Sequence, residues 1–258
     1  MTQLNPTRSL FSQITLTHGD ISLLGRTILA AEELCRAEGV VLSFATPQKF
    51  LEANQANRET WLPIASILNP NFSNVSADNS FFILGRNSSN EIVACQACRL
   101  FDWRGSNFKV ECESLRLWYD DPIKKKKPGE VARVTSFAAA GTSGLVAYSG
   151  AAWYRPDHRG KGLIGFLPRL ARAYASGLWN VDSVVTLMAE NNIKRGVFTR
   201  AGWRNIEWAV DVTNNQSGDI KFAYLWTKSD ELDADFTEFL NSLQEISGRR
   251  ELRRADRK

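Results

Sequence analysis

The segment that most constrains the fold lies in the middle of the chain, where an apolar run is followed by a glycine-rich turn and a helical pattern. The run Leu145 to Tyr154 predicts a buried strand. It leads through Arg155-Pro156-Asp157-His158 into Arg159-Gly160-Lys161-Gly162, which opens a helix that extends to about Ser176. This order of strand, turn and helix start is what a pyrophosphate-binding site requires.

The residues of this turn have separate physical roles. Gly160 and Gly162 carry no side chain, so successive backbone N–H groups can approach anionic oxygens, and the helix start adds unpaired N–H donors. Arg159 and Lys161 can add full positive charge at the rim. The GKS or GKT ending of a P-loop and the spacing of a Rossmann fingerprint are both missing, which argues against nucleoside triphosphate and dinucleotide sites. A purely structural corner is the alternative.

Pro168 predicts a kink in the helix that follows Gly162, or a late start of that helix. The rest of the pattern predicts strands and helices on both sides of this segment. In chain order we expect a loose leader at 1–18, a helix from Asp20 to Gly39, a strand at 40–44, one helix or two at 46–68 with a break near 54–57, a loop at 69–79, a hairpin of strands 81–84 and 92–101, a strand at 108–118, a charged loop at 120–130, the strand and helix described above, a strand at 184–188, a helix at 192–200, a strand through Trp208, a strand at 222–226 and a helix from Ser229.

The turn resembles the coenzyme A motif of the GNAT N-acetyltransferase superfamily, which reads Arg or Gln, two residues, Gly, one residue, then Gly or Ala. Arg159 and Gly162 match, while Ile164 takes the last place and Gly165 follows it by one residue. The resemblance implies that Arg159, Gly160, Lys161, Gly162, Leu163, Ile164 and Gly165 bind the pyrophosphate of acetyl-coenzyme A. It also implies that the backbone of Trp153 and Tyr154 pairs with the pantetheine arm.

A second match to the same superfamily follows downstream. The family pattern has Asn, seven residues later Tyr, and four residues later Gly followed by Phe, and Asn191, Phe198, Gly202 and Trp203 take these places. The resemblance implies a role for Asn191 near the thioester. In many relatives the tyrosine protonates the departing thiolate of coenzyme A, but Phe198 has no proton to give. Phe198 can still pack against the pantetheine.

The two motifs together cover about 50 residues, within 150–203, and predict the fold class and the domains. We expect an α/β (α+β) fold with a GNAT-like mixed central sheet flanked by helices, an N-terminal helical extension and an inserted strand and loop. The expected divisions are an N-terminal leader and helix at 1–38, an acyl-coenzyme A binding domain at 39–228, and a C-terminal helix with a basic tail at 229–258.

The implied function is transfer of an acetyl or other short acyl group from acyl-coenzyme A to an amine by direct attack. Attack by an amine needs a base, commonly a carboxylate. Glu111 and Glu113 would share one face of the expected strand, and Glu190 ends another strand beside Asn191, so all three are candidates, although a salt-bridged role is the alternative for each. His18 and His158 belong to no recognisable triad. The alternative function, favoured by Phe198, is a catalytically silent acyl-coenzyme A sensor.

Composition and charge limit the kinds of binding partner that we expect. The formal net charge is +4, and Arg249 to Lys258 hold six basic and two acidic residues, so the body is neutral and a nucleic-acid partner is not expected. A nucleic-acid role would have to lie in that tail. No long apolar run and no secretory pattern occurs, so we expect a cytoplasmic protein without membrane contact. A homodimer is a further expected partner arrangement. Cys95 and Cys98 would face opposite sides of a strand, and we expect no metal site.

Overall fold

The structure, a computed structural model, describes residues 9–216 and 218–255, with side chains up to residue 245. In chain order its elements are η1 (Phe11–Gln13), α1 (Ile21–Ala37), β1 (Val41–Ala45), α2 (Pro47–Ala56), η2 (Ser66–Leu68), β2 (Ser80–Arg86), β3 (Ile92–Trp103), α3 (Phe108–Glu113), α4 (Pro122–Lys125), β4 (Val131–Val134), α5 (Phe137–Gly141), β5 (Gly144–Tyr154), η3 (Pro156–His158), α6 (Leu163–Trp179), β6 (Ser183–Ala189), α7 (Glu190–Lys194), α8 (Val197–Arg200), β7 (Asn205–Asn215), β8 (Gly218–Lys228) and α9 (Ser229–Ala255).

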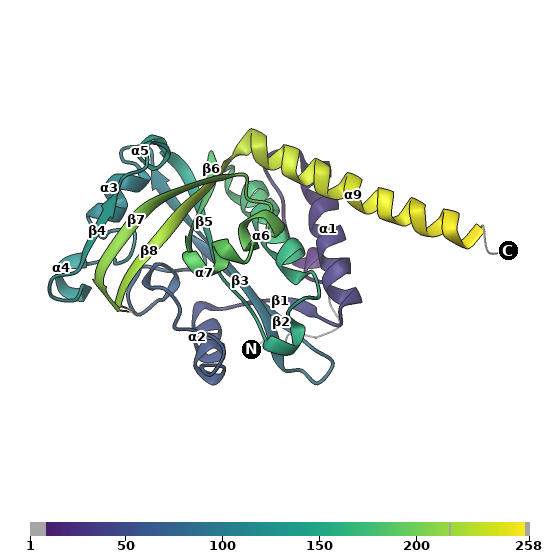
Figure 1. The fold of residues 1–258 in the computed structure, drawn as a ribbon, viewed down its shortest axis with the longest axis horizontal. Helices are drawn as coiled ribbons and strands as arrows, with labels where there is room; N and C mark the ends of the chain where they lie inside the picture. Colours follow the sequence, from purple (N-terminus) through teal and green to yellow (C-terminus); the bar gives the residue numbers. More distant parts are fainter. Residues whose placement is uncertain (1–8, 217, 256–258) are drawn as a thin grey trace.

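All strands of the described residues join one mixed sheet, in the order β1-β2-β3-β5-β6-β8-β7-β4 (Figure 1). Neighbouring strands run antiparallel except for β5 and β6, which run parallel. A parallel pair needs a long crossover, and α6 provides it. The predicted fold class, a mixed central sheet flanked by helices, is confirmed.

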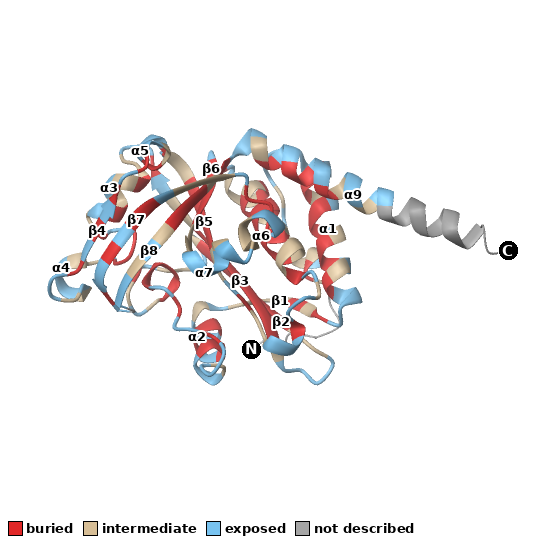
Figure 2. Cartoon of the chain, in the orientation of Figure 1, coloured by how far each residue is buried: buried red, intermediate tan, exposed pale blue. Residues whose placement is uncertain are grey.

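Each face of the sheet carries its own hydrophobic core (Figure 2). The first core joins the apolar faces of α1, α6 and α9 to side chains such as Cys98 and Ala147. The second core lies on the other face and joins α2, the segment 61–68 and α3 to side chains such as Cys95 and Val146. The alternation of neighbouring strand residues between the two cores follows from the two-residue period of a strand. A residue's core therefore tells on which face of the sheet it lies.

The first described residues are tied to the body, so the expected loose leader is wrong for 9–18. The buried carboxylate of Glu32 in α1 accepts hydrogen bonds from Ser9 Oγ at 2.8 Å and from Leu10 N at 2.8 Å. Leu10 is fully buried in the first core. Thr17 N donates to Gly177 O of α6 at 2.8 Å. The rest of the expected leader, residues 1–8, lies outside the described residues.

The expected strand at 108–118 is also wrong, because a short helix, α3, occupies its first half. Asn107 caps this helix, and its Oδ1 accepts a hydrogen bond from Val110 N at 3.0 Å. The apolar residues Phe108 and Cys112 are both fully buried. Their spacing of four residues fits the period of a helix and also the two-residue period of a strand. Local capping decides between the two periods. Glu111 and Glu113 consequently do not alternate along a strand.

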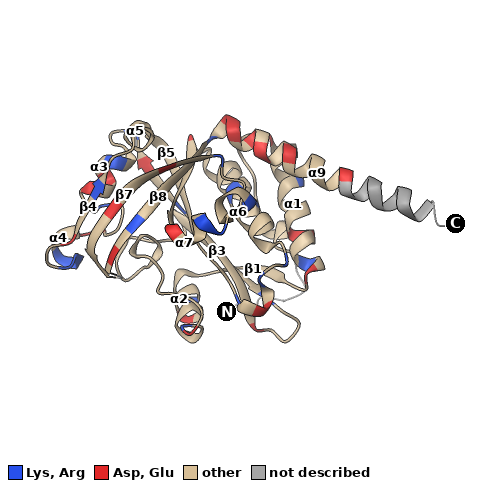
Figure 3. Ribbon diagram, viewed as in Figure 1, with Lys and Arg blue, Asp and Glu red and all other residues tan. Residues whose placement is uncertain are grey.

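Several other expected elements differ in extent. The stretch 46–68 contains α2 and the short 3-10 helix η2, and the expected helix 192–200 is divided into α7 and α8 at Gly196, whose φ is +64°. Strands β7 and β8 are longer than predicted, and β4 was not predicted. The charged loop 120–130 contains α4, where the Lys and Arg positions are visible in Figure 3. The hairpin β2–β3 and the cap at Asp20 are confirmed.

The central helix α6 starts directly after Gly162, so the late start predicted from Pro168 is wrong. Pro168 is the sixth residue of this helix and lacks the N–H that would otherwise reach the carbonyl of Ile164. The helix therefore lacks one internal hydrogen bond at this position.

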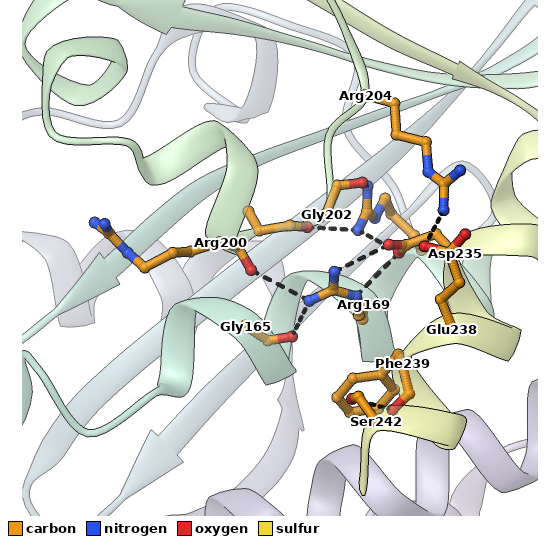
Figure 4. A network of polar contacts seen from close by, with 11 residues as sticks. Gly165, Arg169, Arg200, Gly202, Arg204, Asp235, Glu238, Phe239 and Ser242 are labelled. Atoms are coloured by element: carbon orange, nitrogen blue, oxygen red, sulfur yellow. Dashed lines mark hydrogen bonds and ion pairs between the residues drawn. The ribbon is translucent and has the colours of Figure 1, made fainter. Parts of the chain in front are cut away.

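A network of buried charges joins α6 to α9 and to the chain after α8 (Figure 4). Arg172 is fully buried, and its guanidinium donates to Ala201 O at 2.6 Å, Gly202 O at 3.2 Å and Asp235 Oδ2 at 3.3 Å. Arg169 makes a bidentate pair with Asp235 and also donates to Arg200 O at 3.2 Å. Acidic positions follow the first half of α9 in Figure 3. The network fixes the backbone from Arg200 to Gly202.

Replacement of Asp235 by Ala would leave the buried charge of Arg172 without its counter-ion. We expect this variant to lower the free energy of unfolding by about 3–5 kcal/mol, measured by urea denaturation, because a buried charge deprived of its partner loses its compensation. The control is Glu238→Ala, which breaks the exposed pair with Arg204 on the same helix and is expected to cost less than about 1 kcal/mol. Equal losses in the two variants would contradict the role given to Asp235.

Candidate functional site

The site begins where the two parallel strands separate. β5 and β6 pair only through Val146–Tyr148 and Ser183–Val185. Beyond these residues β5 continues to Tyr154 and β6 to Ala189 without pairing to each other. The backbone N–H and C=O groups on the facing edges of the two strands are therefore available to another partner. The divergence opens a gap in the middle of the sheet.

An irregularity in β5 accompanies the gap. In the pairing with β3, Cys95 faces Trp153 and Ala97 faces Gly150, so β5 carries one extra residue between these two pairs. Ala151, within this bulge, has a φ of +54°, a left-handed conformation that is uncommon for a residue with a side chain. The Cys95 thiol donates to its carbonyl at 3.0 Å. A bulge bends the strand that carries it, which turns the end of β5 away from β6.

A cavity of about 760 Å³ occupies this gap. Its walls include Leu163, Ala201 and Trp203 of the first core and Trp61, Tyr148 and Trp153 of the second. Because the two cores lie on opposite faces, the cavity passes from one face of the sheet to the other. A long ligand can thus enter on the α6 side and place its far end on the opposite side.

The entrance on the α6 side is formed by the glycine-rich turn that the sequence singles out. Gly160 and Gly162 have φ values of +81° and +78°, so both adopt the left-handed conformation that favours glycine. A Cβ at Gly160 would meet no atom within 4 Å, whereas a Cβ at Gly162 would lie 2.9 Å from Phe166 Cζ. Arg159 Nε donates to Tyr154 O at 3.0 Å and thereby fixes the turn against the end of β5.

Three arginines line the cavity near this entrance. Arg159 belongs to the turn, Arg195 lies between α7 and α8, and Arg200 ends α8. Arg200 is placed by its backbone, since its carbonyl accepts from Arg169, and Figure 4 shows its guanidinium pointing away from that network. Of the described residues that line the cavity, none is Asp or Glu. The cavity is thus electropositive at this end, which suits an anionic group.

Aromatic side chains form the opposite end. Trp61 and Trp153 are stacked, with ring centroids 4.9 Å apart and an interplanar angle of 8°. Trp153 Nε1 donates to Thr60 O at 2.9 Å, which holds this indole in place. Trp118 and Phe222 also line the cavity, and their ring centroids are 6.2 Å apart. The far end is therefore apolar and built from rigid, flat side chains.

Gln96 of β3 is a buried polar residue in the cavity wall. Its Nε2 donates to Ser149 Oγ at 3.0 Å, but its Oε1 has no hydrogen-bond partner among the described residues. Gln96 is only 2% exposed, so water does not freely compensate this oxygen. An unpaired buried acceptor costs free energy unless a ligand or bound water donates to it. Gln96 is accordingly a candidate to accept a hydrogen bond from a ligand.

His158 is the buried imidazole of the cavity wall. Its Nδ1 lies 3.0 Å from Asp157 Oδ1, although without the alignment of a hydrogen bond. Asp157 is paired with Arg155, whose guanidinium holds the pKa of that carboxyl well below its usual range. Arg155 holds the ionised carboxyl of Asp157 in place, so this carboxyl can orient the imidazole. Asp157 itself does not line the cavity.

The structure brings most of the predicted cofactor-binding residues together. The cavity wall includes Trp153, Tyr154, Arg159, Gly160, Gly162, Leu163 and Ile164. Lys161, Gly165, Asn191 and Phe198 are not among the lining residues, and Phe198 packs against the first core. Asn192, the neighbour of Asn191, lines the cavity in its place.

The three predicted candidate bases lie outside the cavity wall. Glu190 is exposed and pairs with Lys194 Nζ at 2.7 Å, and this hydrogen bond lowers the pKa of the carboxyl. Glu111 pairs with Arg116, whose guanidinium also lowers the pKa of that carboxyl. Glu113 pairs with Lys109 and accepts from Val134 N at 2.9 Å. Their part in catalysis stays a prediction.

Sequence reasoning missed Gln96, Trp61, Trp118, Arg195 and Arg200 as wall residues. Gln96 did leave a trace, because it is the one amide in the apolar run of β3. The others come from segments far apart in the chain, and no local pattern connects them. No residue of the charged loop 120–130 lines the cavity.

Comparison with known proteins gives no match by sequence, since no family model and no curated protein matches the chain. Among solved structures, the chain is similar to the spermidine/spermine N-acetyltransferase SpeG from Vibrio cholerae in mutant form, at 8% identity over 75% of this chain and 96% of that chain, with a TM-score of 0.44. It is also similar to the aminoglycoside acetyltransferase AAC(6')-Ib in complex with coenzyme A and kanamycin, at 14% identity over 76% and 98%, with a TM-score of 0.42. Each likeness is a partial one of fold.

Among the described residues, no group of three or more His, Cys, Asp and Glu could hold a metal ion. No helix of the described residues combines the length and apolar character needed to cross a bilayer. Cys95 and Cys98 belong to the second and first core respectively, so they face opposite sides of the sheet, as predicted. All four cysteines are buried and unpaired by disulfides.

Burial predicts that the thiols are unreactive in the folded protein. It raises the pKa of Cys35, Cys98 and Cys112 from 9.0 to about 12. A thiol reagent such as DTNB at pH 8 should label no cysteine in the native state and four in urea. Because unfolded thiols ionise near pH 9 and folded ones near 12, their contribution to stability is complete below pH 9 and is lost as the pH rises to 12. Rapid labelling of native protein at pH 8 would contradict this.

Proposed function

We propose that this protein transfers an acetyl or other short acyl group from acyl-coenzyme A to an amine. The observation that carries the proposal is the cavity that crosses the sheet where β5 and β6 diverge. It joins an electropositive entrance at the glycine-rich turn to an aromatic end on the opposite face. Acyl-coenzyme A is a long molecule with phosphates at one end and a thioester at the other, and this cavity matches that polarity.

The residues present fit acyl-coenzyme A. The left-handed glycines and the start of α6 would bind the pyrophosphate through backbone N–H groups, with Arg159, Arg195 and Arg200 adding charge. The free edge of β5 from Ser149 to Tyr154 would pair with the pantetheine amides, and the unpaired Oε1 of Gln96 could accept one of their N–H groups. The thioester would then lie in the gap between the strands.

The proposed transfer is a direct attack. The amine nitrogen attacks the thioester carbonyl, a C–N bond forms, the C–S bond breaks, and the proton lost by nitrogen ends on the sulfur of coenzyme A. None of the four cysteines lines the cavity, which argues against a cysteine-bound intermediate. Tyr148 is among the lining residues, and burial raises the pKa of its hydroxyl to about 12, so the hydroxyl stays protonated at neutral pH. Tyr148 is therefore our candidate to donate a proton to the departing sulfur.

A specific observation supports a second candidate, a silent acyl-coenzyme A sensor. Phe198 has no hydroxyl and packs in the first core, and Glu111, Glu113 and Glu190 are outside the cavity wall. An assay of coenzyme A release with a panel of amines separates the two functions. Saturable release with any amine would exclude the sensor, and a gain in rate in Phe198→Tyr would indicate that an acid was missing.

Binding of the acyl donor gives a direct test of the turn. Acetyl-coenzyme A at about 100 times its Kd should raise the free energy of unfolding by about 2.7 kcal/mol in a thermal or urea assay. Gly160→Asp should abolish this gain, because it places a carboxylate beside the bound phosphates. Gly160→Ala adds the same Cβ and the same left-handed strain without the charge, so it should retain more of the gain than Gly160→Asp does.

A glycine outside the site provides the second control. Gly105 lies in a turn where a Cβ would also meet no atom within 4 Å, and Gly105→Asp should leave the effect of acetyl-coenzyme A unchanged. If acetyl-coenzyme A fails to stabilise the unaltered protein, or if Gly160→Asp responds as the parent does, the proposed function is wrong.

A further inference from the structure

Resting on the proposed function, we infer that the acceptor is an aromatic amine that is unprotonated at neutral pH, rather than an aliphatic amine or a polycation. The charges of the cavity, the shape of its far end and its lack of an acidic base each lead to this class of acceptor.

The charges of the cavity oppose a cationic acceptor. Its wall carries Arg159, Arg195 and Arg200 and, among the described residues, no carboxylate. The acidic residues next in sequence to wall residues are Glu59 and Asp157, and Glu190 lies two positions from the wall residues Met188 and Asn192. None of the three lines the cavity. Asp157 and Glu190 are further neutralised by Arg155 and Lys194. A polyamine would bring several ammonium groups into a space without counter-ions, which is unfavourable.

The far end suits a flat, apolar molecule. Trp153 is stacked on Trp61 and is fixed by its hydrogen bond to Thr60 O, so its ring has a defined orientation. Trp118 and Phe222 bound the same part of the cavity. Flat aromatic rings gain dispersion and quadrupole interactions with such side chains beyond the burial of area alone. An aromatic acceptor would therefore be held by stacking.

The proton chemistry leads to the same class. An aliphatic amine has a pKa near that of lysine, about 10.4, and must lose a proton to a base before it can attack. The ring of an aromatic amine delocalises the nitrogen lone pair, so this amine is already uncharged at pH 7. When its nitrogen forms the C–N bond and the C–S bond breaks, the now acidic N–H gives its proton to the departing sulfur or to water. No carboxylate is required for this step, and the described residues of the cavity wall include none. The one imidazole among them, His158, belongs to the turn at the entrance and not to the aromatic end.

Two isomeric amines provide a matched binding test. 4-Methylaniline and benzylamine contain the same atoms, but only benzylamine is cationic at pH 7. With protein saturated by coenzyme A, calorimetry or quenching of tryptophan fluorescence should show 4-methylaniline binding at least tenfold more tightly than benzylamine and spermidine. Equal or tighter binding of either cation would overturn the inference, and so would absence of 4-methylaniline binding while coenzyme A binds. Failure of coenzyme A itself to bind would instead contradict the proposed function.

A variant at the rim tests the charge argument without disturbing the core. Leu62 lines the cavity and is 83% exposed, so substitution there should not affect folding. Leu62→Glu adds a carboxylate to the rim and should increase the affinity for benzylamine and spermidine at least tenfold. Leu62→Gln introduces a side chain of the same shape as Glu without its charge and should not increase this affinity. An equal effect of the two substitutions would contradict the inference.

Turnover adds a readout that binding alone cannot give. For 4-methylaniline, kcat/KM should be nearly constant from pH 6 to pH 9, because the nucleophile is uncharged throughout this range. For benzylamine it should rise about tenfold per pH unit as the ammonium loses its proton. A tenfold rise per unit with 4-methylaniline would show that an enzyme base governs the reaction and would overturn the inference.

Discussion

The structure depends on the early separation of two parallel strands. β5 and β6 share three residue pairs and then part, and the bulge at Ala151 bends β5 as they do. In most sheets, such a gap would leave backbone groups of two strands without partners in a buried place, which is costly. Here the gap is hollow and continuous with both faces. The same divergence thus creates the cavity and gives it unpaired backbone groups for a ligand.

Burial of charge holds the wall of this cavity in place. The segment that carries Arg200, Ala201 and Trp203 belongs to no strand. Its carbonyl groups accept hydrogen bonds from Arg169 and Arg172 of α6. Asp235 of α9 balances both guanidinium groups. Fixing a loop through buried arginines requires more precise geometry than apolar contact, because each donor must meet an oxygen. Asp235 of the C-terminal helix therefore supports the site without lining the cavity.

The sequence predicted local features better than the relations between distant segments. The glycine-rich turn was predictable because its chemistry is contained in four consecutive residues, and Gly160 and Gly162 have the conformation that only glycine adopts readily. Residues 108–113 were misread because Phe108 and Cys112 fit two periods, and Asn107 decided between them. The divergence of β5 from β6 could not be predicted, since it depends on pairing between strands separated by the whole of α6. The same holds for Trp61, Trp118 and Arg195, which the fold assembles from three separate segments.

The packing of α1 has a consequence for how the chain is made. Its apolar residues Leu24, Ile28 and Ala31 lie in the core shared with α6, and Thr17 bonds to Gly177, 160 residues away. During synthesis from the N-terminus, the first helix leaves the ribosome long before its partner exists. The part of its apolar face that packs on α6 lacks this partner until about residue 179 has emerged, which at elongation rates of about 5–20 residues per second takes many seconds. Nascent chains of this protein would therefore offer a binding surface to ribosome-associated chaperones, and the interval before α6 appears is the period of greatest exposure to aggregation.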